Sequence, residues 1–271
     1  MSALRDKTVL ITGGAAGIGK IMGELCLQEG AKQLIIWDVD KPALLKVGEE
    51  LTGKGYQVHA YHVDVSKLDE VTKAAAEVRE NQGEIDILFN NAGVIIGKQF
   101  HEHTHRDIDF IMRINTDALM HIALEFLPGM ISRGSGHIVN VASAAGMTPN
   151  PKMAVYVASK WAVIGWSESL RLELEARSKN LRVTTVTPFY INTGMFDGVH
   201  SPIVPILNPH KAARKIISGV KQNKIFVRMP GIVYLLPFVK GILPQRWADT
   251  VIGKWFGIYK SMERFKGKGG E

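Results

Sequence analysis

The chain has 271 residues, of which 46% are hydrophobic and 22% charged, as in ordinary globular proteins. This length fits one large α/β domain or two small ones. The single cysteine, Cys26, excludes an internal disulfide and favours a reducing compartment, and its place in a predicted helix indicates a buried, inert thiol. No signal peptide and no run of about 18 consecutive apolar residues is evident, so we expect a cytoplasmic protein, soluble or peripheral to a membrane.

The net charge of +7 is concentrated at the C-terminal end. From Pro209 onward lie 13 of the 33 Lys and Arg residues but only 3 of the 26 Asp and Glu residues. A basic chain invites nucleic-acid binding, but no nucleic-acid recognition motif accompanies this charge. We therefore expect no nucleic-acid partner.

The first predicted unit is a strand, a glycine-rich turn and a helix. Lys7–Thr12 is a short β-rich run, and Ile21–Gln28 has apolar residues at helical spacing. Between them, Gly13, Gly17 and Gly19 would let the backbone approach a pyrophosphate, which the free N–H groups of the helix N-terminus favour. The alternative is a plain strand-to-helix connection with no ligand.

A second strand, Gln33–Asp38, ends in an acid. Asp38 follows Gly19 by 19 residues, close to the ~20 expected of a carboxylate that binds the adenosine ribose of NAD. It would repel a 2′-phosphate, and no Arg or Lys lies between Gly13 and Gly19. The sequence therefore favours NAD over NADP.

The alternation of helices and short apolar strands continues, which implies a parallel sheet covered on both faces. The run Asn90–Gly93 ends the fourth strand, where an Asn side chain can lock the turn and Gly93 can let the backbone approach a cofactor. The expected elements are helices 42–51 and 69–81 and strands 57–63 and 86–90.

The segment His101–His105 contains three histidines at alternate positions, but it does not predict a metal site. Alternate residues share a face only on a strand, and no nearby Cys or His completes a tetrahedral set. A helix start at Thr104 is expected instead, with the helix running to about Ile131. It contains Asn115 among apolar residues, and a buried Asn needs partners such as a site water or a backbone group.

A hydroxyl, a phenol and an ammonium are expected together after the fifth strand, residues 137–142. Ser143 ends this strand, and Tyr156 and Lys160 lie four residues apart on one face of a predicted helix from about 154 to 178. The ammonium would favour the phenolate, so Tyr156 could take or give a proton while Ser143 binds the substrate oxygen. Tyr-x-x-x-Lys also occurs by chance on amphipathic helices.

The C-terminal third supports more than one interpretation. After a sixth strand, 181–188, the connection 189–207 is apolar and suggests a lid over a greasy substrate, or ordinary packed surface. A helix, 209–222, and a short strand, 224–228, follow. The extension 229–271 mixes aromatic and aliphatic residues with Lys and Arg; this pattern suits a membrane surface, an apolar rim of the substrate mouth or a dimer contact.

Taken together, the motifs resemble the short-chain dehydrogenase/reductase family over nearly the whole chain. The resemblance rests on Thr12-Gly13-x-x-x-Gly17-x-Gly19, Asp64, Asn90–Gly93, Asn115, Ser143 and Tyr156-x-x-x-Lys160, in that order. It implies catalysis by Asn115, Ser143, Tyr156 and Lys160: Tyr156 as acid/base, Ser143 orienting the substrate oxygen, Lys160 lowering the pKa of Tyr156 and holding the nicotinamide ribose, and Asn115 holding a water. The implied cofactor-binding residues are Gly13, Gly17, Ile18, Gly19, Asp38, Asp64, Val65, Asn91, Ala92, Gly93, Tyr156, Lys160, Ile191 and Thr193.

Phe189 stands after Pro188 where Gly is commoner, which resembles the branch of retinol dehydrogenases and lipid-droplet 17-beta-hydroxysteroid dehydrogenases. We expect a single doubly wound α/β domain (Rossmann fold) over residues 1–271, with a seven-stranded parallel sheet in the order 3-2-1-4-5-6-7. The expected reaction is hydride transfer between NAD and a secondary or allylic alcohol of a hydrophobic substrate. The alternatives are an NADP-dependent reductase of small carbonyls and a non-catalytic, lipid-associated scaffold. The family also implies a homodimer or homotetramer.

Overall fold

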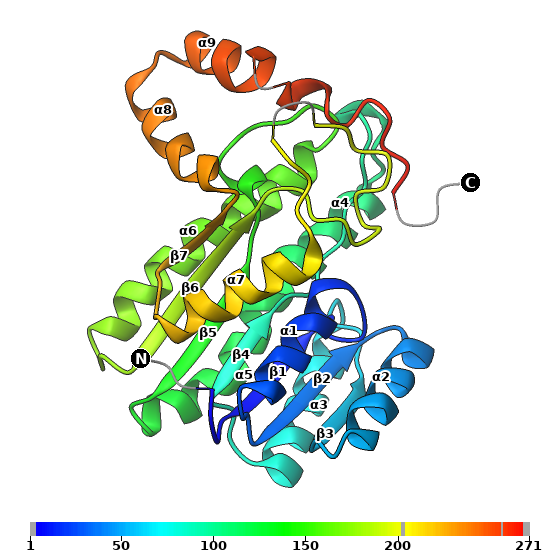
Figure 1. Cartoon of the computed structure of the whole chain (residues 1–271), viewed down its shortest axis with the longest axis vertical. Coiled ribbons are helices and arrows are strands. Elements are labelled where there is room, and N and C mark those ends of the chain that lie inside the picture. The colour runs from blue at the N-terminus through cyan, green and yellow to red at the C-terminus, as the bar shows by residue number, and fades with distance from the viewer. Residues whose placement is uncertain (1–3, 202–203, 256, 268–271) are drawn as a thin grey trace.

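A parallel sheet of seven strands forms the centre of the protein (Figure 1). The computed structural model describes residues 4–201, 204–255 and 257–267. The strand order β3-β2-β1-β4-β5-β6-β7 and the parallel direction of every pair confirm the predicted topology. The strands are β1 (Thr8–Thr12), β2 (Gln33–Asp38), β3 (Val58–His62), β4 (Ile87–Asn90), β5 (Gly136–Val141), β6 (Leu181–Pro188) and β7 (Phe226–Met229).

Helices cover both faces of the sheet, because successive strand residues point to opposite sides. Val9 and Ile11 face the layer that holds α1, α2 and α7, whereas Leu10 faces the layer that holds α3, α5 and α6. Cys26 is fully buried in the first layer, as expected. The helices of the two layers are α1 (Gly17–Gln28), α2 (Lys41–Gly53), α7 (Pro209–Lys221), α3 (Leu68–Gln82), α5 (Ala118–Ser132) and α6 (Ala154–Glu175).

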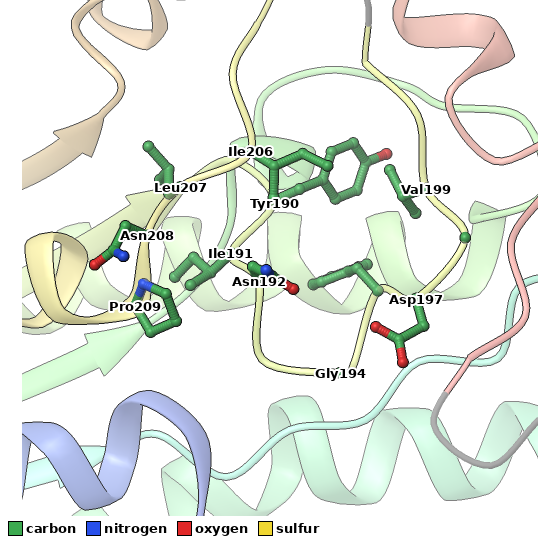
Figure 2. Close-up of a pocket in the computed structure, with 12 residues that line it drawn as sticks. Tyr190, Ile191, Asn192, Gly194, Asp197, Val199, Ile206, Leu207, Asn208 and Pro209 are labelled. Atoms are coloured by element: carbon green, nitrogen blue, oxygen red, sulfur yellow. The ribbon is translucent and has the colours of Figure 1, made fainter.

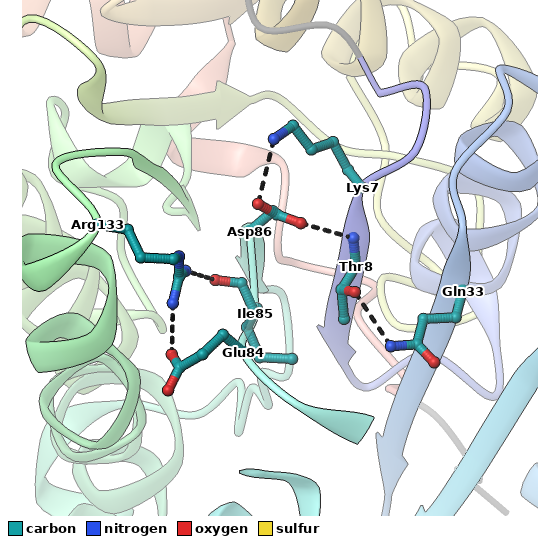
Figure 3. A network of polar contacts seen from close by, with 7 residues as sticks. All are labelled: Lys7, Thr8, Gln33, Glu84, Ile85, Asp86 and Arg133. Atoms are coloured by element: carbon teal, nitrogen blue, oxygen red, sulfur yellow. Dashed lines mark hydrogen bonds and ion pairs between the residues drawn. The ribbon is translucent and has the colours of Figure 1, made fainter. Parts of the chain in front are cut away.

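The amino ends of the central strands are joined by a polar network (Figure 3). Asp86 accepts hydrogen bonds from Lys7 Nζ at 3.2 Å and from Thr8 N at 2.9 Å. Arg133 donates to Glu84 at 2.6 Å and to the carbonyl oxygen of Ile85 at 2.8 Å. Side chains that fasten β1 and β4 therefore occupy this end, and the residues predicted to bind and react lie at the opposite, carboxyl end.

Two regions differ from the sequence-based expectation. The single helix expected from 104 to 131 is divided into α4 (His105–Met112), a π-helical turn η2 (Arg113–Asp117) and α5. The expected strand at 224–228 is β7, shifted by one to two residues. A π turn holds one extra residue, which reorients the side chains that follow and cannot be seen in apolar periodicity.

The C-terminal extension folds into short helices above the carboxyl end of the sheet (Figure 1). They are η4 (Gly231–Leu235), α8 (Leu236–Ile242), α9 (Gln245–Ala248), η5 (Asp249–Trp255) and η6 (Ile258–Lys260). Within the described residues, none of the helices has both the length and the apolar character needed to cross a bilayer.

Candidate active site

The glycine-rich turn after β1 has the backbone shape that the sequence predicts. Gly13 and Gly17 have φ angles of +64° and +55°, in the left-handed region that glycine adopts freely. A Cβ on Gly19 would overlap the carbonyl oxygen of Gly13 and lie 2.6 Å from Asn91 Nδ2. The chain can pass this close only without side chains, so the three glycines are needed for the turn itself.

The N-terminus of α1 follows this turn with its first N–H groups uncapped, because Ala16 at the cap position makes no side-chain hydrogen bond. Such N–H groups favour a phosphate. Asp38 lies beside them, where one carboxylate oxygen accepts from Ala15 N at 2.9 Å and the other from Asp40 N at 3.0 Å. The glycine turn, the open helix end and the acid together fit the pyrophosphate and ribose of a nicotinamide dinucleotide.

The end of β4 is locked onto this turn. Asn91 Nδ2 donates to the carbonyl oxygens of Thr12 at 2.9 Å and Gly13 at 3.0 Å. Thr12 Oγ1 in turn accepts from the backbone N–H groups of Asn91 and Ala92, both at 3.0 Å. The expected locking role of an Asn is confirmed for Asn91, while Asn90 is buried and donates to Asn140 at 2.9 Å.

Asp64 and Val65, at the end of β3, are placed less directly. One Asp64 oxygen accepts from both the backbone N–H and the hydroxyl of Ser66, at 3.0 and 2.7 Å. Val65 packs against the α3, α5 and α6 layer. These contacts shape the turn, and a cofactor contact by either residue stays a prediction.

Ser143, Tyr156 and Lys160 come together at the carboxyl end of β5, as predicted. All three are buried, with relative exposures of 9%, 5% and 3%. Ser143 Oγ accepts from Ala145 N at 3.1 Å, and Lys160 Nζ lies 5.7 Å from the centre of the Tyr156 ring. Lys160 Nζ donates to the carbonyl oxygen of Val141 at 3.0 Å, which holds the ammonium beneath the phenol.

Burial is the largest influence on the pKa values of Tyr156 and Lys160. Burial raises the pKa of the Tyr156 phenol above its ordinary value, and the hydrogen bond with Ser143 lowers it only in part. Burial also lowers the pKa of Lys160 to about 8. The expected lowering of the Tyr156 pKa by Lys160 stays a prediction.

Asn115 is fully buried in the π turn η2, and such turns often occur at functional sites. Its amide donates to Val94 O at 2.9 Å and to Ser159 Oγ at 3.1 Å, and its oxygen accepts from Val94 N at 2.8 Å. Both donor hydrogens of the amide are thus in use. The expected contact with a water stays a prediction and would have to use the oxygen.

Gly93 joins the two halves of the site. A Cβ on Gly93 would lie 3.3 Å from Asn115 Oδ1 and 3.6 Å from Lys160 Nζ. On the other side, a Cβ on Gly17 would lie 3.6 Å from Thr193 Cβ, so the chain after β6 reaches the glycine turn. Ile18 and Ile191 pack in the apolar layer below. The predicted cofactor and catalytic residues therefore line one continuous edge.

Several residues at this edge were not predicted from sequence. Ser159 links Asn115 to the catalytic helix by donating to the carbonyl oxygen of Tyr156 at 2.7 Å. Phe196 packs edge-on against Tyr156, with 6.2 Å between ring centres, and Tyr190 packs on Phe196 at 5.0 Å. The Ser in Tyr-x-x-Ser-Lys was a visible signal for Ser159, whereas nothing in an apolar loop singles out Phe196.

Two cavities lie along the connection after β6. One, of about 380 Å³, lies between the connection after β6 and the start of α7, and Tyr190, Ile191, Asp197 and Asn208 are among its walls (Figure 2). The other, of about 70 Å³, is almost wholly apolar. It begins beside Ser143 at Ala144, Thr148 and Phe189, and the C-terminal extension completes it with Ile232, Val233, Leu235, Leu236, Val239, Val251, Ile252 and Ile258.

The structure does not support a metal site at His101–His105. His101 and His105 are exposed, whereas the His103 ring is buried and its Nδ1 lies 4.0 Å from Asp107. The described residues contain no group of three or more His, Cys, Asp or Glu side chains that could hold a metal ion.

Comparison with known proteins identifies the family. The family model for short chain dehydrogenase matches residues 7–202. Epidermal retinol dehydrogenase 2 of Mus musculus is 34% identical over 265 residues, which cover 96% of this chain and 85% of the relative. Estradiol 17-beta-dehydrogenase 11 of Rattus norvegicus is 32% identical over 250 residues, covering 92% and 84%. The chain belongs to the short-chain dehydrogenase family.

Solved structures agree with this assignment. A short chain dehydrogenase/reductase from Burkholderia phymatum in complex with NAD has a TM-score of 0.80 at 25% identity, covering 89% of this chain and 95% of that one. A metagenomic short-chain oxidoreductase in complex with NADP has a TM-score of 0.71 at 27% identity, covering 84% and 97%. The chain is thus an NAD(P)-dependent alcohol dehydrogenase or reductase, and its relatives include both NAD and NADP complexes.

Proposed function

We propose that this protein transfers a hydride between NAD and a secondary or allylic alcohol, or the matching carbonyl, of a hydrophobic molecule. The observation that carries the proposal is the joint burial of Ser143, Tyr156 and Lys160, with Lys160 Nζ 5.7 Å from the phenol ring, at the strand edge that also bears the glycine turn. The nicotinamide supplies the hydride chemistry. The protein positions the substrate and handles its proton.

The proposed roles follow from the contacts. Ser143 Oγ orients the substrate oxygen beside the Tyr156 hydroxyl, which gives a proton to a carbonyl oxygen or takes one from an alcohol. Lys160, held by Val141 O, carries charge beneath the phenol and would bind the nicotinamide ribose. Asn115 holds Val94 and Ser159 in place and so supports the wall of the site.

NAD is the proposed cofactor because of Asp38. Its carboxylate is bonded to the backbone at Ala15 and Asp40, so it stays at the glycine turn where the adenosine ribose would lie. A 2′-phosphate there would face a fixed negative charge. The alternative, an NADP-dependent reductase of small carbonyls, requires this carboxylate to move or to be neutralised.

A hydrophobic substrate is supported by the apolar cavity next to Ser143. Ala144 and Phe189 form its inner wall, and side chains of the extension, such as Leu236 and Ile252, form its outer wall. A small polar carbonyl would gain nothing from these side chains, whereas an apolar chain or ring would bury its surface there. The substrates in the relatives' names, retinol and estradiol, are apolar alcohols of this kind, and we propose a retinoid-, steroid- or lipid-like substrate.

The test is turnover of NAD(H) and NADP(H) with a panel of retinoids, steroids, medium-chain secondary alcohols and small carbonyls. We expect NAD-dependent activity on the apolar alcohols or their carbonyls. Activity restricted to NADP and small carbonyls would overturn both the cofactor and the substrate assignment. Cofactor binding without turnover of any substrate, together with lipid binding, would favour the scaffold alternative.

We also propose that the extension contacts a lipid surface. Leu235, Phe238, Ile242 and Trp247 are exposed by 56% to 68% on η4, α8 and α9, and α8 and α9 stand away from the sheet in Figure 1. No acid lies between residues 229 and 248, while Lys240 and Arg246 do. Exposed apolar side chains among cations suit an anionic bilayer interface.

Co-sedimentation with anionic vesicles tests this contact. Phe238→Ser with Trp247→Ser should release the protein, and the control Leu45→Ser, an exposed leucine on α2, should not. Equal binding of vesicles by both variants would show that the extension does not make the lipid contact.

A homodimer or homotetramer is the proposed assembly. The exposed side chains of Leu124 on α5 and Leu172 on α6 support this proposal. Sedimentation equilibrium measures the oligomeric state.

A further inference from the structure

A buried polar cluster joins the C-terminal end of the chain to the residues around the catalytic tyrosine. Asn150, Tyr190 and Ser261, here called the polar latch, have relative exposures of 8%, 6% and 1%. They come from the loop before α6, the chain after β6 and the C-terminal extension. Burial raises the pKa of Tyr190 to about 12, so this phenol stays protonated and acts as a hydrogen-bond donor.

The direction of each hydrogen bond in the polar latch follows from the donors available. Ser261 Oγ donates its only hydrogen to Ile258 O at 2.7 Å. In the 2.9 Å contact between the two hydroxyls, Tyr190 must therefore donate to Ser261. Asn150 Nδ2 donates to Tyr190 Oη at 2.8 Å and to Ser261 Oγ at 3.1 Å. The three side chains thus form one directed network.

The backbone beside Ser261 is fastened to the chain after β6. His200 N donates to Ser261 O at 3.1 Å, and Lys266 N donates to Asp197 O at 2.9 Å. Residues 258–266, here called the C-terminal strap, run beside this chain in Figure 1. The strap also packs Met262 and Phe265 against Gly97, after β4.

The polar latch reaches Tyr156 through aromatic rings. Tyr190 packs against Phe196 with 5.0 Å between ring centres, and Phe196 packs edge-on against Tyr156 at 6.2 Å. Met262 of the strap belongs to the same apolar cluster as Tyr156. A shift of Tyr190 would therefore move the ring that walls the catalytic phenol.

We propose that Tyr190 and Ser261 are positioning residues, which hold residues 196–200, and with them Phe196, against Tyr156 so that the alcohol binds beside Ser143. This proposal rests on the function proposed above and adds the C-terminal strap to that site. The polar latch touches neither the glycine turn nor Asp38. Its loss should change alcohol binding and leave cofactor binding as it is.

The kinetic test uses Tyr190→Phe and Ser261→Ala, which break the same hydrogen bond from opposite sides. Each should raise the KM for the alcohol about tenfold, the change expected for one buried hydrogen bond, with the KM for NAD unchanged. The double variant should raise the KM by less than the product of the two single effects, because both single variants lose the hydrogen bond between Tyr190 and Ser261, although each also loses its own bond with Asn150. The matched control is Tyr259→Phe, which removes a 2.8 Å hydrogen bond to Asp249 within the extension and should leave both KM values unchanged.

A second readout does not depend on turnover. Hydrogen–deuterium exchange should be at least about tenfold faster for the peptide that contains the His200 amide in both latch variants, and unchanged in Tyr259→Phe. Unchanged exchange would overturn the latch itself. Faster exchange with an unchanged alcohol KM would overturn the positioning role. If exchange were faster but even the wild-type protein turned over no alcohol, the proposed function would be rejected, while the polar latch would be supported as a structural feature.

Discussion

The site has a lower part and an upper part that are built in different ways. The lower part, at the carboxyl ends of β1, β4 and β5, holds its polar groups by hydrogen bonds to strand ends and their turns: Asn91 to Thr12 and Gly13, and Lys160 to Val141. The upper part is held by contacts between segments far apart in the sequence, such as the hydrogen bond of Asn150 with Ser261. It comprises the described residues of the ranges 189–207 and 229–267.

This difference separates two tasks. Groups fixed to a sheet keep their geometry, which proton transfer and hydride transfer require. Apolar walls built from short helices and a connection can vary without disturbing that geometry. We infer that the lower part, together with Ile191 and Thr193, determines the chemistry and the cofactor, and that the rest of the upper part determines which alcohol enters. Each prediction below would break or sharpen this separation.

The largest expected effect is that of Tyr156→Phe in the lower part. Removing the hydroxyl removes the proposed acid/base, so kcat should fall by about 10²- to 10⁴-fold, while NADH binding, followed by fluorescence titration, should be unchanged. Activity within tenfold of the wild type would show that another group moves the proton.

Gly19→Ala should come next, because its Cβ would overlap Gly13 O. Displacing the glycine turn should raise the KM for NAD about 100-fold, as small misplacements can. Gly165→Ala on α6 is the matched control, since nothing lies within 4 Å of its Cβ. That change should leave activity unchanged and stabilise the fold by about 0.5–1 kcal/mol. If both substitutions changed the KM for NAD equally, the glycine turn would have no specific role in cofactor binding.

The pH dependence should differ between the two directions of the reaction. Because burial raises the pKa of Tyr156, the phenol is protonated around neutral pH. Carbonyl reduction, which needs that proton, should vary little between about pH 6 and 7, below the Lys160 pKa of about 8, whereas alcohol oxidation, which needs the phenolate, should rise about tenfold per pH unit over the same range. Initial rates of both reactions measure this. A flat profile for oxidation would mean that the proton leaves to a group of much lower pKa.

Asp38→Ala has the smallest expected effect. Loss of the carboxylate removes the repulsion of a 2′-phosphate, so the ratio of kcat/KM for NAD to that for NADP should fall by about tenfold, or roughly 1.4 kcal/mol. The matched control is Asp40→Ala, which removes the N-terminal cap of α2 and not the acid at the turn. An unchanged ratio for Asp38→Ala would show that cofactor choice depends on other residues.

Most of the lower part could be predicted from the sequence. Its features depend on local chain geometry, which can be predicted from residue spacing. These features are the periodicity of the strands, the spacing of the glycines and the four-residue interval between Tyr156 and Lys160. Asn115 was singled out, but its π turn was not, because one extra residue in a helical turn barely changes the apolar pattern. The burial of Tyr156, which raises the pKa of its phenol, was not predicted either, because it depends on packing with residues far along the chain, such as Phe196.

The upper part could not be predicted in the same way. Its apolar character was visible, and a greasy wall near the site was one of the interpretations. Which residues meet, however, depends on pairings such as Ser261 with Tyr190 and Phe265 with Gly97, which have no local signal. The apolar cavity forms only when Leu236 and Ile252 return over Ala144.

The most direct test of the separation is a series of secondary alcohols of increasing chain length, oxidised with NAD by the wild-type protein. If the upper part buries the substrate chain beside Ser143, kcat/KM should rise up to about fourfold per added methylene until the apolar cavity is full, as expected for about 0.8 kcal/mol each. The KM for NAD should stay constant across the series. Values of kcat/KM that do not change or that fall with chain length would contradict the account.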